Sequence, residues 1–191
     1  MILLIAAFGI LIWVRVTHQP WSTIGLGRPR NWLLTIVTGI VFGIAFKFFM
    51  KAIVMPLLGA SPVNQAYHYL EGNTAALPGF IATLLISAGF AEEVVFRGFL
   101  FWGMGKRLGT GQAATVATIV ISAVLFGLGH WQGQKLPGVE QATVVGLVWG
   151  TIYARTRNLW MLMIGHAAFD LTALWMIYNG LETRIAHLVF K

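Results

Sequence analysis

Residues 80–101 read FIATLLISAGFAEEVVFRGFLF, an apolar stretch that carries Glu92, Glu93 and Arg97 in its second half. A helix of about 20 apolar residues crosses a hydrocarbon core about 30 Å thick, so this stretch is long enough to span a membrane. Insertion scales assign about −4 to −7 kcal/mol to its twelve Leu, Ile, Val and Phe residues and about +8 to +10 kcal/mol to three central charges. The helix is stable in lipid only if its charges have partners. The stretch therefore predicts both a membrane span and a polar site inside it.

The composition of the whole chain also indicates a membrane protein. Of 191 residues, 58% are hydrophobic and 10% are charged, whereas an ordinary soluble domain has about 25% charged residues. The absence of cysteine excludes disulfide scaffolds, thiol catalysis and cysteine-ligated metal sites. Basic cytoplasmic loops explain the formal net charge of +7 better than nucleic-acid binding does. We therefore predict the lipid bilayer, and no nucleic acid, as a partner.

Apolar runs and helix punctuation predict one all-α domain over residues 1–191, a multi-pass transmembrane helical bundle. The first run is interpreted as a helix rather than a signal peptide, because it lacks a basic start and a small-residue cleavage site. Residues 181–191 are too short to cross and are expected at the interface. Six spans are expected, at residues 1–14, 32–58, 79–104, 112–130, 138–154 and 159–178.

The charges of the loops predict how this bundle is oriented. Loops 15–31, 105–111 and 155–158 together carry seven Arg and Lys residues, and the loops on the other side carry only Lys135. Because cytoplasmic loops are enriched in basic residues, we expect these three loops in the cytoplasm and the N-terminus outside.

The third span contains a pair of charges and a third charge that the pair leaves out. Glu93 and Arg97 are spaced i, i+4 and can form an ion pair on one helix face. Glu92 lies about 100° around an α-helix from Glu93 and needs a different partner.

Other polar residues inside spans are the candidate partners of Glu92. His130 ends the fourth span, and His166 and Asp170 are spaced i, i+4 in the sixth. Ionisable residues within spans usually face the bundle interior or a wet cavity and mark a functional path. A carboxylate with histidines is a set of groups that activates water at neutral pH, with or without a metal. At 1.5 Å per residue these groups lie at unequal depths, so the helices must be tilted or staggered to bring them together.

Two further pairs at helical spacing are assigned no chemistry. Lys47 and Lys51 lie toward the outer half of the second span, where long side chains can snorkel to the interface. Gly39 and Gly43 form a GxxxG pair, as do two glycines in the fifth span, and such pairs favour close helix contacts.

Three motifs in this order resemble those of the CPBP family of intramembrane proteases (CAAX proteases and bacteriocin-processing enzymes, also called Abi). The family's patterns are EExxxR, FxxxH and HxxxN or HxxxD, and the resemblance covers about residues 24–178. Residues Ile24–Pro29, which read IGLGRP, are also similar to the Gly-Leu-Arg stretch that often precedes the core in this family. The matching residues are Glu92, Glu93, Arg97, Phe126, His130, His166 and Asp170.

The resemblance implies an endopeptidase that hydrolyses a peptide bond of a membrane-associated, prenylated or bacteriocin-type substrate. It also implies a site inside the bundle that opens toward the cytoplasm, in a bacterial or archaeal plasma membrane. Glu92 would be the general base for water, His130 would hold that water, and His166 with Asp170 would lie near the scissile carbonyl. Glu93 and Arg97 would support this catalytic group.

Asp170 departs from the asparagine that many proteases of the family have. An ionised aspartate cannot donate a hydrogen bond to an oxyanion, so that role would pass to His166, with Asp170 orienting its ring. Alternatively, Glu92, His130, His166 and Asp170 would ligate a divalent metal such as zinc, although no HExxH spacing supports this. No cofactor is therefore assigned with certainty.

Two rival functions stay open at this point. A non-enzymatic membrane scaffold or bacteriocin-immunity protein would keep the same residues as a structural polar cluster. A small transporter would use Glu92 as a proton site, but a bundle without internal repeats argues against it. Proteolysis requires Glu92, His130 and His166 to face one wet cavity, whereas a scaffold requires only that every polar group be paired.

Overall fold

A computed structural model of the chain describes residues 2–190, and every regular element in that part is helical. The elements are α1 (Ile2–Val16), η1 (Trp21–Ile24), α2 (Trp32–Phe49), η2 (Met50–Val54), α3 (Met55–Leu57), η3 (His68–Leu70), η4 (Thr74–Ala76), α4 (Leu77–Thr83), η5 (Leu84–Glu92), η6 (Val94–Phe99), α5 (Leu100–Leu108), α6 (Gln112–Leu128), α7 (Trp131–Thr156), α8 (Leu159–Tyr178) and α9 (Glu182–Ala186). The all-α fold class is confirmed.

The predicted spans coincide with the observed helices to within a few residues. Trp32–Leu57, Thr74–Leu108 and Leu159–Tyr178 are each long and apolar enough to cross a membrane, and α1 and α6 are shorter apolar helices. The expected fifth span corresponds to α7, whose backbone breaks at Lys135, with Pro137 two residues later. The number of six crossings stays a prediction.

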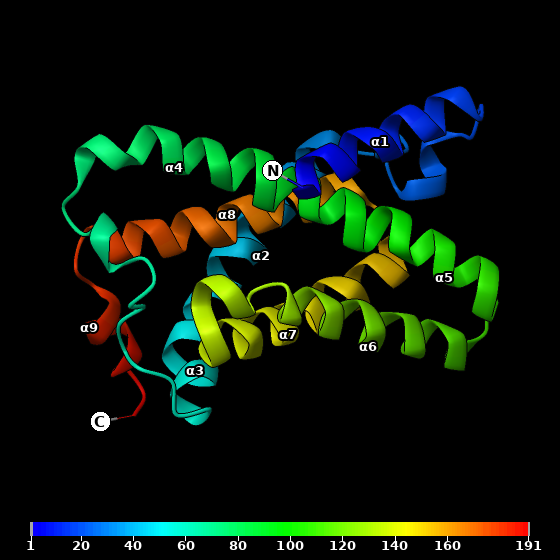
Figure 1. The fold of residues 1–191 in the computed structure, drawn as a ribbon. Helices are drawn as coiled ribbons and strands as arrows, with labels where there is room; N and C mark the ends of the chain where they lie inside the picture. The colour runs from blue at the N-terminus through cyan, green and yellow to red at the C-terminus, as the bar shows by residue number, and fades with distance from the viewer. Residues whose placement is uncertain (1, 191) are drawn as a thin grey trace.

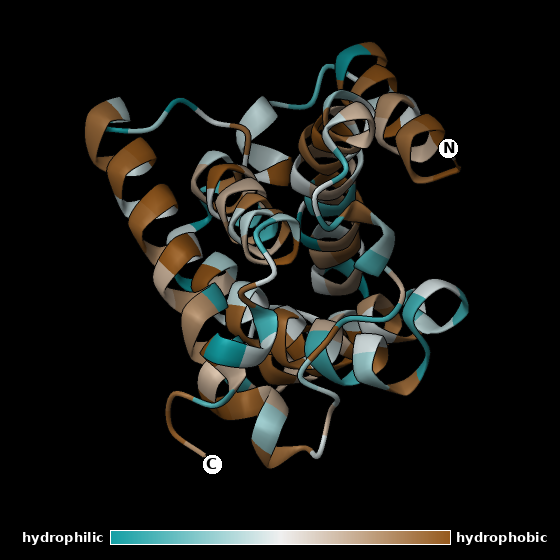
Figure 2. Cartoon of the chain, turned by 90° about the vertical axis from the view of Figure 1, so that its left-hand side faces the viewer, coloured by the Kyte–Doolittle hydropathy of each residue, from teal (hydrophilic) through white to brown (hydrophobic). Residues whose placement is uncertain are grey.

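The outer surface of the bundle is suited to lipid. On α6, the exposed side chains at i, i+4 spacing are the apolar Val116, Val120, Val124 and Leu128. In Figure 2 the helices at the margin of the bundle are mostly brown (hydrophobic), and teal is more frequent in the connecting loops. Because apolar surface this extensive is unfavourable in water, the exposed faces indicate contact with a bilayer.

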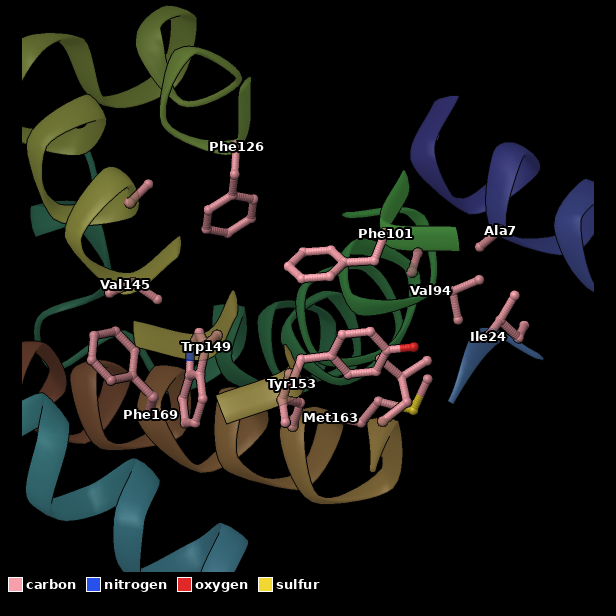
Figure 3. Packing of buried hydrophobic residues seen from close by; sticks show 14 of the residues in the cluster. Ala7, Ile24, Val94, Phe101, Phe126, Val145, Trp149, Tyr153, Met163 and Phe169 are labelled. Atoms are coloured by element: carbon pink, nitrogen blue, oxygen red, sulfur yellow. The ribbon is translucent and has the colours of Figure 1, made fainter. Parts of the chain in front are cut away.

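Aromatic side chains from three helices fill the core between α2, α7 and α8. Trp149 of α7 is fully buried, and its ring centroid lies 5.1 Å from that of Phe42 and 5.9 Å from that of Phe46. Figure 3 shows Trp149 of α7 beside Phe169 of α8, and Tyr153 of α7 further along, close to Phe101. This packing fixes the faces that α7 and α8 present to the interior.

Glycines allow two helix pairs to approach closely, as the GxxxG pairs predicted. A Cβ atom on Gly43 of α2 would lie 2.2 Å from the carbonyl oxygen of Gly165 on α8. A Cβ atom on Gly146 of α7 would lie 2.8 Å from the Cα of Ala123 on α6. Neither backbone could come this near with a side chain in the way, so the glycines determine where the site helices meet.

The helix that carries the first motif is not a regular α-helix. Residues 84–92 and 94–99 form π-helical turns, with hydrogen bonds from i to i+5. The carbonyl oxygen of Phe96 accepts a hydrogen bond from the Ser122 hydroxyl of α6 at 3.0 Å. Such turns are rare and often occur at functional sites. They change the angular spacing of Glu92 and Glu93 from the α-helical value used in the sequence analysis.

The helices are staggered, which resolves the unequal depths of the site residues. In Figure 1, α5 and α6 extend further to the right than the start of α8. His166 Nε2 lies 3.9 Å from Glu92 Oε2, so these two residues lie at the same depth although their positions along the predicted spans differ. The stagger of the helices therefore aligns the site residues, which straight helices beginning and ending at equal depth would not do.

Candidate active site

A single cavity of about 730 Å³ collects all four predicted catalytic residues. Glu92, His130, His166 and Asp170 all line it, together with Phe126. These side chains come from η5, the end of α6 and α8, so residues from three separate motifs meet at one site. A cavity shared by these groups is the arrangement that hydrolysis requires.

Glu93 is the centre of the buried polar network. Its Oε1 accepts a hydrogen bond from Arg97 Nη1 at 2.9 Å and another from His166 Nδ1 at 2.7 Å. The side chains of Glu93 and Arg97 are both 0% exposed. The predicted Glu93–Arg97 pair is confirmed, and its charges hold each other in a region without water.

The orienting partner of His166 differs from the expectation. The sequence predicted Asp170 as the residue that orients the ring. In the structure, His166 Nδ1 donates a hydrogen bond to Glu93 instead. Asp170 Oδ2 lies 3.6 Å from the other nitrogen, Nε2, beyond hydrogen-bond distance. The i, i+4 spacing on α8 placed Asp170 near the ring, but the interhelical contact with Glu93 fixes it.

Glu92 is the carboxylate that faces the cavity. Its Oε2 lies 3.9 Å from His166 Nε2 and makes no hydrogen bond with any group in residues 2–190. Its side chain is 14% exposed, compared with 0% for Glu93. Adjacent glutamates therefore have different environments, and Glu92 is the one free to accept a proton from a bound molecule.

His130 has its tautomer fixed by its own helix end. Its Nδ1 lies 2.8 Å from the carbonyl oxygen of Phe126, and since a carbonyl can only accept, Nδ1 carries the proton. In the neutral ring, Nε2 is then the acceptor nitrogen. The Phe126 ring packs edge to face against His130 and His166 and also lies 4.3 Å from the Arg97 guanidinium. One aromatic residue thus separates the buried ion pair from the cavity.

The expected zinc set is not assembled here. No group of three or more His, Asp or Glu side chains in residues 2–190 is placed to hold a metal ion. His166 directs one nitrogen to Glu93, while the other is 3.9 Å from Glu92 and 3.6 Å from Asp170. These donors do not fit a closed four-ligand shell.

Two lysines and one tyrosine are cavity residues that the sequence did not assign to the site. The expectation that Lys47 and Lys51 snorkel outward is wrong, because both line the cavity and are 6% and 8% exposed. Tyr67, in the loop before η3, also lines it and packs edge to face on Phe80. Burial, followed by the charge of Asp170, raises the pKa of Tyr67, so its hydroxyl stays a hydrogen-bond donor. The sequence around Tyr67 carries no motif, so its place in the cavity becomes visible only when the loop folds over the cavity in the tertiary structure.

The cavity lies toward the end of the bundle opposite the basic loops. We call these ends the cavity end (loops 58–67 and 129–135, and α9) and the basic end (loops 15–31, 105–111 and 155–158). At the basic end, the backbone N–H of Leu159 donates a hydrogen bond to the carbonyl oxygen of Gly25 at 2.9 Å, which connects the start of α8 to the loop 15–31. Figure 1 shows α9 at the left and the α5–α6 connection at the right. The sequence predicted that both the basic loops and the opening of the site face the cytoplasm. Because they lie at opposite ends of the bundle, these two predictions exclude each other.

A comparison with protein-family models matches residues 74–172 to the type II CAAX prenyl endopeptidase Rce1-like family. The chain belongs to this family. The matched segment contains all three motifs, so the resemblance to CAAX proteases is confirmed. Membership identifies the chain as a CAAX-type intramembrane endopeptidase, and its apolar helices agree with a membrane location. Neither the curated proteins nor the solved structures yield a match.

Proposed function

We propose that this Rce1-like protein hydrolyses a peptide bond of a membrane-associated substrate with a water molecule activated by Glu92. The observation that carries the proposal is the contrast between the two adjacent glutamates. Glu93 accepts hydrogen bonds from both Arg97 and His166 through its Oε1, whereas Glu92 lines the cavity and its Oε2 has no hydrogen bond from residues 2–190. A scaffold would need both carboxylates paired.

The proposed reaction uses only side chains of this chain. Glu92 takes a proton from water as the water oxygen bonds to the scissile carbonyl carbon. His130 accepts a hydrogen bond from the water through Nε2. His166, with a proton on both ring nitrogens among the carboxylates of Glu92, Glu93 and Asp170, donates a hydrogen bond through Nε2 to the developing oxyanion, and the Tyr67 hydroxyl donates another. Glu92 then returns its proton to the leaving nitrogen as the carbon–nitrogen bond breaks.

The test is hydrolysis by the purified protein in lipid vesicles. A pool of peptides is incubated with the wild type and with Glu92→Gln, and mass spectrometry identifies new termini. Internal cleavage by the wild type alone supports the proposal. A wild type that binds peptides from the pool but leaves them uncut favours the scaffold reading.

Asp170 distinguishes a hydrogen-bonding site from a metal site. Because Glu93 already holds the His166 ring, we expect Asp170→Asn to keep substantial activity, and its amide can also donate to the oxyanion. Elemental analysis of wild type and variant, with peptidase activity from the same samples, checks this. Stoichiometric metal in the wild type that disappears with activity in Asp170→Asn would establish Asp170 as a metal ligand instead.

The finer localisation that we propose has the N-terminus outside and the basic end in the cytoplasm. Seven basic residues against one support this orientation. The cavity end then opens on the opposite face of a bacterial or archaeal plasma membrane, and the substrate reaches it from there.

Single cysteines test this orientation, because the chain has none of its own. Ser61 at the cavity end and Thr110 at the basic end are both exposed. We expect a membrane-impermeant maleimide to label Ser61→Cys in intact cells and Thr110→Cys only after permeabilisation. The reverse pattern would place the cavity on the cytoplasmic side.

A further inference from the structure

Lys47 is a buried cation inside the cavity of the proposed active site. It lies in the last turns of α2, is 6% exposed and lines the same cavity as Glu92 and His166. A lysine near the centre of a membrane helix costs about 2.5–3.5 kcal/mol on insertion scales. Intramembrane charges of this kind usually have a partner or a function.

The neighbouring Lys51 is an example of a buried lysine whose charge has a partner. Lys51 Nζ lies 2.6 Å from Glu182 Oε1 and 2.6 Å from the carbonyl oxygen of Pro62. Glu182 also accepts hydrogen bonds from the backbone N–H of Asn64. This ion pair ties α9 and the 58–67 loop to the end of α2. Lys51 therefore has a structural role and a counter-charge in direct contact.

Lys47 has no such counter-charge. Its Nζ donates to the neutral Gln141 Oε1 at 3.2 Å and lies 4.8 Å from the centroid of the Phe169 ring. Within residues 2–190, no carboxylate oxygen comes within 4.0 Å of this Nζ, and Asp170 is directed to His166 at 3.6 Å. The cavity thus contains an ammonium group that an amide and an aromatic face hold in place and that no carboxylate of residues 2–190 contacts directly.

The position of Lys47 relative to the reacting groups fits an extended peptide. Phe169 is three residues after His166 on α8, a rise of about 4.5 Å along the helix. The ammonium group over Phe169 is therefore about one helical turn from the catalytic histidine. An extended peptide covers at most about 3.3–3.6 Å per residue, so a group a few residues from the scissile bond reaches this point.

We propose that Lys47, held by Gln141, binds a carboxylate of the peptide substrate within a few residues of the scissile bond. This inference rests on the proposed endopeptidase function. The carboxylate comes from the C-terminus of the substrate or from an acidic side chain, and both have the same chemistry. A charge-assisted hydrogen bond shielded from water supplies the selectivity.

The test compares three peptides of one cleavable sequence: a free acid, a C-terminal amide, and an amide with Asp as the last residue. For the wild type we expect KM for the plain amide to exceed KM for the free acid about ten- to hundredfold, at similar kcat. Selectivity for the free acid over both amides identifies the C-terminus, and equal use of the Asp peptide identifies the side chain. Three equal KM values would overturn the proposal while leaving the peptidase function intact.

Variants assign the effect to Lys47. Lys47→Met should abolish the selectivity and Lys47→Arg should retain it. Lys135→Met is the matched control, because Lys135 lines the same cavity but is exposed. Loss of selectivity in Lys135→Met but not in Lys47→Met would overturn the assignment.

Two further measurements keep this test separate from folding and from catalysis. Lys47→Met should be at least as thermally stable as the wild type, because it removes an unneutralised buried charge. A large loss of stability would indicate a structural role instead. Peptide binding to Glu92→Gln, measured by fluorescence anisotropy, should show the same preference for a carboxylate even if no peptide is cleaved.

Discussion

Glu92→Gln should lose peptide hydrolysis by about a hundred- to ten-thousandfold, the usual range for removing a general base. Glutamine has the same shape but cannot take a proton from water. Since Glu92 Oε2 makes no hydrogen bond within residues 2–190, its replacement breaks no hydrogen bond at this atom and removes only the 3.9 Å approach to His166 Nε2. The variant should therefore insert, fold and bind peptide as the wild type does. The measurement is the initial rate of peptide cleavage in lipid vesicles, at equal amounts of protein.

Glu140→Gln is the matched control for this loss. Glu140 lies on α7 but does not line the cavity, so its replacement should leave the rate unchanged. Wild-type activity in Glu92→Gln would refute the water-activation mechanism. If Glu140→Gln lost as much activity as Glu92→Gln, the loss would be a general effect of removing a negative charge.

Glu93→Gln should have its largest effect on stability. Breaking a buried ion pair by removing one partner costs about 3–5 kcal/mol, because the other charge is left buried. Here Arg97 is fully buried, and His166 loses the carboxylate that holds its ring. For a chain of this size, we expect Tm to fall by about 10 °C. Activity should fall as well, since the ring is no longer oriented.

A double variant separates these two consequences. In Glu93→Gln with Arg97→Met, the stranded guanidinium is gone, so much of the lost stability should return. The His166 ring still lacks its carboxylate partner, so activity should remain low. The two changes should thus be strongly non-additive in Tm, as expected for residues in contact. A Glu93→Gln variant that melts like the wild type would contradict the network described here.

The match between predicted and observed helices has a simple cause. In a bilayer, each span must bury its backbone polar groups internally, so long apolar runs become helices wherever they occur. Charged loops and helix punctuation then mark their ends. The Glu93–Arg97 pair was equally predictable, because residues at i, i+4 are neighbours on an α-helix, and the pair also forms on the π-helical turns observed here.

The direction in which the two lysines point could not be predicted from the sequence pattern. Lys47 and Lys51 were expected to reach outward, because a long side chain near a helix end can do so. The inward direction depends on how α2 is rotated against α8, and this rotation follows from the close contact of Gly43 with Gly165. The sequence shows that the glycines favour contact but does not say which side of the helix the lysines then face.

The contact between Glu93 and His166 also belongs to the tertiary structure. The two residues are 73 positions apart, and their 2.7 Å hydrogen bond depends on the stagger of the helices and on π-helical turns. A helix that is apolar on most sides has no single hydrophobic face, so its rotation and depth cannot be read from periodicity. The partner of His166 was therefore predicted from its own helix, where Asp170 is nearest in sequence.

By itself, the sequence determined that this chain is an all-α membrane protein, and it predicted four of the polar residues that line the cavity. Both follow from local physical chemistry, since apolar length and the cost of intramembrane charge are properties of each segment alone. Only the tertiary structure decided that Glu93 is the hydrogen-bond partner of His166, that Lys47 lies in the cavity, and at which end that cavity lies. These depend on helix rotation, stagger and packing, which arise when segments distant in the chain compete for the same space.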